Sequence, residues 1–176
     1  MVYHVILLAL LFSISHSRIY PLYKQCDPRW KIEKLGTSSK NICDYGCAIS
    51  SVAMALSGTG HNYNPSTLNT WVKENRGFLY DYYLIWPSVN PLGIKYMGVV
   101  SRSNIASSLS AGHIVILNVR NGGHWVLATS MSGNTIYVND PGYSTTSYSL
   151  YDVVPNKSKL YYVGSSSYLG MTTDEL

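Results

Sequence analysis

The sequence has few charged residues. Only 12% of its 176 residues are Asp, Glu, Lys or Arg, about half of the ~25% that is usual in globular proteins. Sixteen Tyr, with many Ser, Thr, Asn and Gly, supply polarity instead. Since 46% of the residues are hydrophobic, the composition excludes a disordered chain and a coiled coil, and it is more typical of secreted than of cytosolic proteins.

Runs of basic residues are lacking as well. The net charge is +4, but the thirteen Lys and Arg are scattered singly between Arg18 and Lys159, so we expect no nucleic-acid partner. No repeat, low-complexity stretch or linker interrupts residues 18–170. The length suits one domain and is too short for two, so residues 18–176 are predicted to form a single domain, which we expect to be a monomer.

One long hydrophobic run is present, near the start of the chain. Eight apolar residues extend from Val5 to Phe12 and are followed by small residues, including Ser15 and Ser17. The run is shorter than the ~20 residues needed to cross a bilayer, and signal peptidase accepts small side chains. Residues 1–17 are therefore predicted to be a signal peptide, with no membrane anchor after its removal. A buried N-terminal strand or helix is the alternative.

Two further signals concern the cellular compartment. The last residues, Thr173-Asp174-Glu175-Leu176, resemble an endoplasmic-reticulum retrieval signal but have Thr where that signal has a basic residue. The sequon Asn156-Lys157-Ser158 makes Asn156 a possible glycosylation site. We expect the protein to be secreted, or to lie in the lumen of the secretory pathway or the lysosome.

The first half of the chain is predicted to be helical. Small and apolar residues from Cys47 to Leu56 are typical of a buried helix. A second helix has Asn64 as its N-cap and Pro65 in its first turn, and it ends before Gly77. The aromatic segment 78–86 is ambiguous.

The second half, from about Pro91, is predicted to consist mainly of strands, with one short helix over residues 104–110. Helices followed by an antiparallel sheet indicate an α+β domain. The expected strands cover residues 94–100, 114–120, 124–131, 135–139 and 160–163, with 148–154 as a less regular one.

Three cysteines leave at least one thiol unpaired, and Cys47 is the residue best placed for chemistry. It follows Gly46 and opens the first helix, where free N–H groups and the helix dipole favour a thiolate. A nucleophile suits this position. A small buried hydrophobic residue is the alternative, because most cysteines serve in that way.

A thiol nucleophile needs a base, and three histidines lie beyond the signal segment. His61 is expected in a loop that faces solvent, and His113 is expected to be structural at the start of a strand. His124 begins a strand after the Asn121-Gly122-Gly123 turn. A histidine at the rim of a sheet can face a helix N-terminus, so His124 is the preferred base.

Strand pairing selects a carboxylate for His124. If residues 132–134 form a three-residue hairpin loop, Met131 faces Thr135, and Asp140 lies opposite Val126 on the side of the sheet that carries His124. A two-residue loop would reverse the direction of Asp140. The alternative is that residues 139–142 form a turn in which Asp140 has no catalytic role.

Gln25 is the last member of the set. It lies upstream of Cys47, and an uncharged amide can donate a hydrogen bond to an oxyanion. By itself a single Gln indicates no function.

Five motifs occur in order: Gln25-Cys26-Asp27-Pro28-Arg29-Trp30, Leu35-Gly36, residues 46–54 (GCAISSVAM), Gly123-His124-Trp125-Val126 and Asn139-Asp140-Pro141-Gly142. Together they resemble the papain-like cysteine peptidases, in particular the secreted branch related to the bacteriocin-processing peptidases that cleave after double glycine. The resemblance covers about residues 23–142.

The resemblance implies a papain-like fold, with N-terminal helices packed on a C-terminal antiparallel sheet. It implies Cys47 as nucleophile, His124 as base, Asp140 as the group that orients the base, and Gln25 as oxyanion donor. The implied activity is hydrolysis of amide bonds in a peptide or protein substrate, without a cofactor or metal. A binding domain without turnover, and a cell-wall peptide hydrolase or acyltransferase that uses the same thiol, are the alternatives.

The resemblance also bears on the other two cysteines. Cys26 and Cys43 each lie a few residues from one member of the implied site, and in an oxidising compartment a disulfide between them could hold Gln25 near the Cys47 helix. A Cys43–Cys47 pair would consume the nucleophile. A zinc site at Cys43, Cys47 and a histidine lacks a fourth ligand at a suitable spacing.

Overall fold

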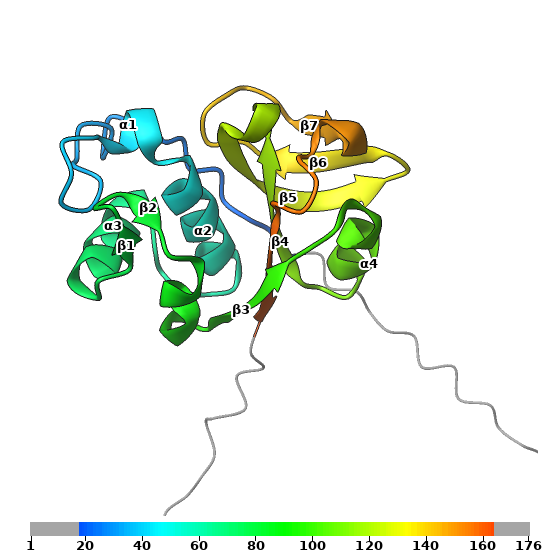
Figure 1. The fold of residues 1–176 in the computed structure, drawn as a ribbon, viewed down its shortest axis with the longest axis horizontal. Coiled ribbons are helices and arrows are strands. Elements are labelled where there is room, and N and C mark those ends of the chain that lie inside the picture. The colour runs from blue at the N-terminus through cyan, green and yellow to red at the C-terminus, as the bar shows by residue number, and fades with distance from the viewer. Residues whose placement is uncertain (1–17, 164–176) are drawn as a thin grey trace, which may run out of the picture.

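Helices and an antiparallel sheet form two layers of the computed structural model, which describes residues 18–163 (Figure 1). The helical layer is built from the first half of the chain and the sheet from the second half. The predicted signal peptide, residues 1–17, and the retrieval-like tail, residues 173–176, lie outside the described residues.

The helical layer consists of α1 (Ile42–Tyr45), α2 (Cys47–Gly58) and α3 (Pro65–Glu74). α3 begins at Pro65, as predicted, and its N-cap Asn64 forms a reciprocal capping box with Thr67. α2 lies between α3 and the sheet (Figure 1). Every residue from Ile49 to Leu56 is buried, since small side chains let neighbours approach α2 on all its faces.

The main sheet has six antiparallel strands in the order β3-β8-β4-β5-β6-β7. A separate hairpin pairs β1 with β2 beside the helical layer (Figure 1). The bounds are β1 Phe78–Leu79, β2 Tyr83–Leu84, β3 Ile94–Val99, β4 Ile114–Val119, β5 His124–Ser132, β6 Thr135–Asn139, β7 Ser147–Ser149 and β8 Lys159–Val163.

The sheet has a core on each side, and β4 contributes to both. All six β4 residues are buried because successive side chains of a strand point to opposite faces. Ile114 and Ile116 pack with α2 in one cluster. Val115 and Leu117 pack in the second cluster with Ile105 of α4 (Ile105–Ser110). α2 is thereby held against one face of the sheet.

The predicted three-residue hairpin loop between β5 and β6 is wrong. Ser132 pairs with Thr135, so the loop has two residues. A bulge between Ala128 and Ser130 then shifts the register by one residue, and Leu127 pairs with Asn139. Since the extra residue of a bulge compensates for the shorter loop, Asp140 still follows β6 at the level and on the side expected.

Three other segments differ from the sequence prediction. The expected strand over residues 148–154 is shorter, because β7 ends at Ser149 and a 3₁₀ turn, Leu150–Asp152, follows with its own capping box. The ambiguous segment 78–86 contains the β1–β2 hairpin and leads into a 3₁₀ helix, Trp86–Leu92. The one-turn helix α1 has no counterpart among the predicted elements, because four residues are too few for a helical period.

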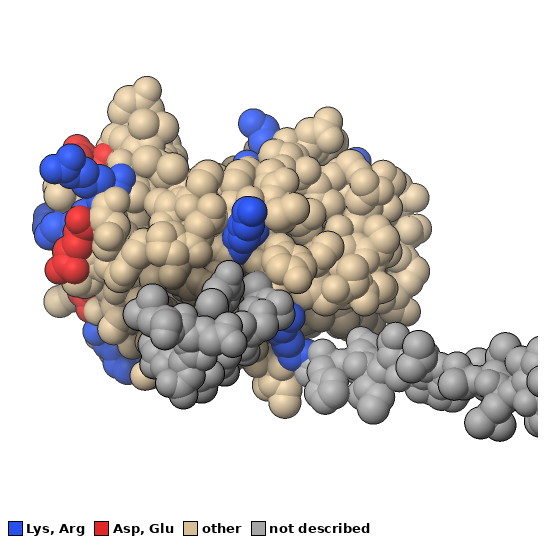
Figure 2. Space-filling model, turned by 90° about the horizontal axis from the view of Figure 1, so that it is seen from below, with Lys and Arg blue, Asp and Glu red and all other residues tan. Residues whose placement is uncertain are grey.

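The surface reflects the low charge content. Most of the face in Figure 2 is uncharged, and the visible acidic side chains lie at the left edge among several Lys and Arg, over the helical layer. Over residues 18–163, none of the helices combines the length and the apolar character needed to cross a membrane.

Candidate active site

Cys47 is the first residue of α2, and its local backbone depends on the glycine before it. The N–H of Gly46 donates to the carbonyl of Ile42 over 2.8 Å, which closes α1 and starts α2 at the next residue. A Cβ at position 46 would lie 2.4 Å from that carbonyl oxygen, so only Gly fits here. Cys47 is half-buried with a free thiol, in the first turn of α2, where backbone N–H groups lack helical partners.

His124 is fixed by the turn that precedes β5. Arg120 and Asn121 both adopt left-handed backbone conformations, with φ of 53° and 55°, a strained combination in residues other than Gly. The buried amide of Asn118 holds this turn by donating to the carbonyls of Gly122 and His124, each over 3.2 Å. His124 is 5% exposed and lies at the rim of the sheet.

Asp140 follows β6 and receives four hydrogen bonds on its two carboxylate oxygens. Its Oδ1 atom lies 2.7 Å from Nε2 of His124 and accepts the backbone N–H groups of Gly142 and Tyr143, each over 2.9 Å. Its Oδ2 atom accepts the hydroxyl of Tyr148 over 2.8 Å. The residue is 1% exposed, and these bonds satisfy a buried charge that would otherwise be costly.

The electrostatics of the pair follow from these contacts. Burial lowers the pKa of His124, but hydrogen bonds with Asp140 and with Cys47 outweigh it and raise that pKa to about 9. Nε2 faces Asp140, which leaves Nδ1 for Cys47. Burial raises the pKa of Asp140, but the bonds from His124, Tyr143 and Tyr148 outweigh it and hold that pKa below its usual value. An imidazolium beside a carboxylate is therefore the favoured state near neutral pH.

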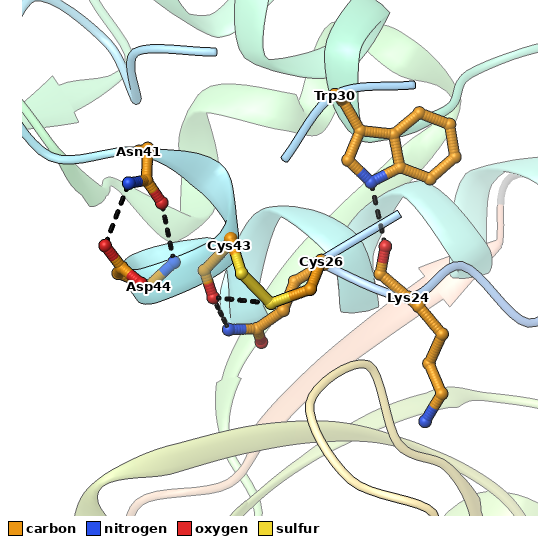
Figure 3. Close-up of a disulfide and its surroundings, with 7 residues drawn as sticks. Lys24, Cys26, Trp30, Asn41, Cys43 and Asp44 are labelled. Atoms are coloured by element: carbon orange, nitrogen blue, oxygen red, sulfur yellow. Dashed lines mark hydrogen bonds between the residues drawn. A yellow bond between two sulfur atoms is a disulfide. The ribbon is translucent and has the colours of Figure 1, made fainter. Parts of the chain in front are cut away.

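A disulfide ties the Gln25 segment to α1, as Figure 3 shows. Cys26 and Cys43 are bonded, as the resemblance implied, which leaves Cys47 as the free thiol of the three cysteines. The side chain of Gln25 donates through Nε2 to the carbonyl oxygen of Cys43. Since an amide nitrogen carries two hydrogens, the second donor of Gln25 remains for another acceptor.

The same segment is anchored on its other side to the Asp140 turn. The backbone N–H of Gln25 donates to the carbonyl of Pro141 over 2.9 Å, and Nζ of Lys24 donates to the carbonyl of Asp140 over 2.9 Å. A Cβ on Gly142 would lie 2.9 Å from Cε1 of His124 and 3.3 Å from Oε1 of Gln25. Gly142 therefore allows the turn, the imidazole and the amide to pack closely.

The other two histidines lie elsewhere. His61 follows the C-terminal end of α2, opposite to Cys47, where its Nδ1 lies 3.1 Å from Oγ1 of Thr59. It lies in the predicted loop and is half-buried against Gly93, so it faces solvent only in part. His113 precedes β4, at the end of that strand away from the 120–123 turn, and its ring contacts Tyr162.

Two further sequence predictions can be located. Asn156 is exposed, with a φ of 53°, whereas Ser158 of the same sequon is buried and its hydroxyl accepts the N–H of Asn118 over 3.3 Å. Within residues 18–163, no group of three or more His, Cys, Asp or Glu side chains is arranged to hold a metal ion.

The structure also places residues at the site that the sequence did not indicate. Tyr148 comes from β7 and contacts Asp140. The Tyr143 ring packs edge-on against the His124 ring, with centroids 5.1 Å apart, and the guanidinium of Arg120 lies 3.7 Å from the Tyr143 ring centroid. No spacing rule marks these residues, because each reaches the site through a loop or through the pairing of a third strand.

Comparison with known proteins places the chain in a family. Residues 19–169 match the Peptidase_C39 like family. No curated protein matches the sequence.

Two solved structures are similar in fold. A double glycine motif protease from an AMS/PCAT transporter, in complex with the leader peptide, is 14% identical with a TM-score of 0.57, covering 86% of this chain and 96% of that one. A C39-like peptidase from Bacillus anthracis is 15% identical with a TM-score of 0.53, covering 83% of this chain and 96% of that one. These neighbours confirm the expected papain-like α+β fold.

Proposed function

Since the chain belongs to the Peptidase_C39 like family and is thus a cysteine peptidase-like hydrolase, we propose that it hydrolyses peptide bonds through Cys47, His124 and Asp140. Gln25 supplies a hydrogen bond to the oxyanion. The observation that carries this proposal is the position of the His124 ring, which lies 2.7 Å from Asp140 and whose pKa is raised by its interactions with Asp140 and with Cys47.

The chemistry follows from these contacts. The Cys47 thiolate attacks the carbonyl carbon of the substrate, and a tetrahedral oxyanion forms. Gln25 and the N-terminal backbone N–H of α2 are the donors available for that oxyanion. The imidazolium of His124 gives its proton to the leaving amine as the carbon–nitrogen bond breaks, and a thioester remains.

Water completes the cycle. The neutral imidazole removes a proton from a water molecule, the resulting hydroxide attacks the thioester carbonyl, and the carbon–sulfur bond breaks. The products are a carboxylic acid and the regenerated thiolate beside an imidazolium. Throughout the cycle the Asp140 carboxylate keeps the ring oriented and stabilises its charged form.

A peptide is the substrate class that fits. One structural neighbour is described as a double glycine motif protease in complex with the leader peptide, which supports a peptide as the substrate of this chain. The residues on either side of the cleaved bond are not assigned by this likeness, because the neighbour shares 14% of its residues with this chain.

Incubation of the purified protein with a diverse peptide library, read by mass spectrometry, tests the proposal. Cleavage products are expected with the protein and are expected to be absent with Cys47→Ala. Equal product with both would refute the role of Cys47. A matched control is Tyr137→Phe, at an exposed residue of β6 outside the proposed site, which is expected to cleave as the unmodified protein does.

A second measurement separates an active thiol from a binding domain without turnover. Iodoacetamide is expected to alkylate Cys47 rapidly at pH 6, whereas a thiol of ordinary pKa, near ~8.5, is almost unreactive at that pH. Slow alkylation, like that of free cysteine, would favour the binding domain.

We also propose that the protein acts outside the cytosol, after removal of residues 1–17. The Cys26–Cys43 disulfide supports this, because disulfides persist in oxidising compartments. The exposed Asn156 would carry a glycan there. Expression in a eukaryotic secretory host, followed by N-terminal sequencing and glycosidase treatment, tests both points. A retained N-terminus would contradict the first, and unchanged mobility the second.

A further inference from the structure

Among the hydrogen bonds of the described residues, only the Tyr148 side chain donates to Oδ2 of the Asp140 carboxylate. Its hydroxyl donates to Oδ2 of Asp140 over 2.8 Å. Oδ1 of the same carboxylate faces His124 and two backbone N–H groups. A carboxylate rotates about one bond, so a donor on Oδ2 fixes the direction in which Oδ1 points.

The position of Tyr148 is itself well determined. It lies on β7, where it pairs with Ile136 of β6, and it is 9% exposed in the second core cluster. On the side of the 120–123 turn, Arg120 interacts with the Tyr148 side chain, which raises the pKa of Arg120. A cation beside the hydroxyl makes that hydroxyl a stronger donor to the carboxylate.

Arg120 also lies over the ring of Tyr143, 3.7 Å from its centroid, and this ring packs against His124. The left-handed backbone at positions 120 and 121 brings the guanidinium to this place. A strained backbone of this kind persists only where contacts with the surrounding structure hold it in place, and it is common at functional sites.

We propose that Tyr148 is a positioning residue of the active site, which orients and keeps ionised the Asp140 carboxylate that holds His124, and that Arg120 supports it. The inference rests on the proposed peptidase function and deepens it. Tyr148 lies beyond the residues on which the resemblance to papain-like peptidases is based.

Charged and titratable groups surround Asp140 on each side. His124 and, beyond it, Cys47 face it from β5 and α2. Arg120 acts from the turn before β5, Lys24 donates to its carbonyl from the N-terminal segment, and Tyr143 donates its N–H from the following loop. Removal of the Tyr148 hydroxyl leaves all of these in place and takes away one donor to the charged carboxylate.

The expected effect has a definite direction. Without the Tyr148 hydroxyl, the ionised form of Asp140 is less stable, so its pKa rises and the carboxylate is protonated at higher pH. The pKa of Asp140 is therefore expected to rise by about one unit, the usual size for one hydrogen bond to a charged group. The imidazolium of His124 then keeps its counter-charge over a narrower pH range.

The pKa of Asp140, followed by NMR through the ¹³C shift of its carboxyl carbon in a pH titration with steps fine enough to resolve one unit, tests the proposal without knowledge of the substrate. The variant is Tyr148→Phe, which keeps the ring and its packing. The matched control is Tyr137→Phe on β6, whose ring is 46% exposed and which we have not placed at the site. Thermal unfolding of each variant is measured alongside.

The proposal expects the pKa of Asp140 to rise in Tyr148→Phe and to stay unchanged in Tyr137→Phe. Arg120→Gln is expected to raise the pKa of Asp140 by less. An unchanged pKa of Asp140 in Tyr148→Phe, whether or not the melting temperature falls, would overturn the proposal by leaving Tyr148 a structural role only. Failure of the proposed function looks different, because Cys47 of the unmodified protein would then lack fast alkylation at low pH.

Discussion

The backbone N–H of Gln25 donates to the carbonyl of Pro141 over 2.9 Å, although 116 residues separate them in the chain. The bond joins the segment that carries the proposed oxyanion donor to the turn that carries Asp140. On its other side the same segment is tied to α1 through the disulfide between Cys26 and Cys43. The geometry of the site therefore depends on a short segment around Gln25 that is fixed on both sides.

Removal of the disulfide is expected to destabilise the protein. The bond closes a loop between residues that lie seventeen apart, and a loop of about 15 residues corresponds to about 3 kcal/mol of stabilisation. The free energy of unfolding of Cys26→Ala/Cys43→Ala, measured in urea, should fall by roughly that amount. An unchanged free energy of unfolding would show that backbone hydrogen bonds such as that between Gln25 and Pro141 are enough to hold the Gln25 segment in place.

Substitution of Gln25 by Ala should separate oxyanion binding from activation of the thiol. Loss of one oxyanion donor reduces kcat by about 10²-fold in well-studied hydrolases. Alkylation of Cys47 by iodoacetamide forms no oxyanion, so its rate at pH 6 should change little. The two rates are measured on the same preparation. If alkylation slows as much as hydrolysis, Gln25 acts on the thiol or on the fold rather than on the oxyanion.

The route from sequence to site shows what local patterns can and cannot predict. The start of α2 at Cys47 follows from Gly46 and from the small residues behind it, and strand alternation places β5 at His124. The contact between His124 and Asp140 was predicted through a loop that turned out shorter. A bulge between Ala128 and Ser130 restores the register, and no residue pattern in β5 distinguishes that bulge from regular strand.

Tyr148 marks the limit of sequence reasoning more clearly. Its contact with Asp140 depends on the pairing of β7 with β6, a strand of three residues whose pairing is non-local. The sequence predicts a longer strand over residues 148–154. In the structure the strand ends at Ser149, because Ser149 and Asp152 form the capping box of a 3₁₀ turn. Side-chain hydrogen bonds between distant strands require the assembled sheet.

Gly142→Ala is expected to impair catalysis without unfolding the protein. The added Cβ would lie 2.9 Å from Cε1 of His124, so the ring or the turn must move by several tenths of an ångström. Displacements of this order in a catalytic group can reduce kcat by roughly 10- to 100-fold. Peptide hydrolysis measures the loss, and thermal unfolding should change by only a few degrees.

The matched control is Gly123→Ala, which directly precedes His124. Its added Cβ would have its nearest contact at 3.5 Å, with the carbonyl of Arg120, and its φ of −84° suits any residue. Near-normal activity is expected for this variant. If both variants lose activity equally, proximity to His124 in the chain matters rather than the predicted collision.

The pH dependence of hydrolysis should have its alkaline limb near pH 9. The protonated His124 must give its proton to the leaving amine, and its pKa is raised to about 9. Activity is therefore retained through neutral pH and is lost as pH rises through about 9, rather than near the ~6.5 of an ordinary histidine. Initial rates between pH 5 and pH 10 (~0.5-unit steps, fine enough to resolve a shift of one unit) locate the limb.

Asp140→Asn tests the origin of that raised pKa. The substitution removes the negative charge and one of the two accepting oxygens of the carboxylate, so burial lowers the pKa of His124 with less to oppose it. The alkaline limb should move to lower pH, and kcat should fall by roughly 10²-fold, because less imidazolium is present and the ring is poorly oriented. The His124 ring protons, followed by NMR in both proteins, report the same shift without turnover. If the NMR pKa of His124 is unchanged in Asp140→Asn, the Cys47 thiolate is the counter-charge that sets it, and Asp140 acts on orientation alone.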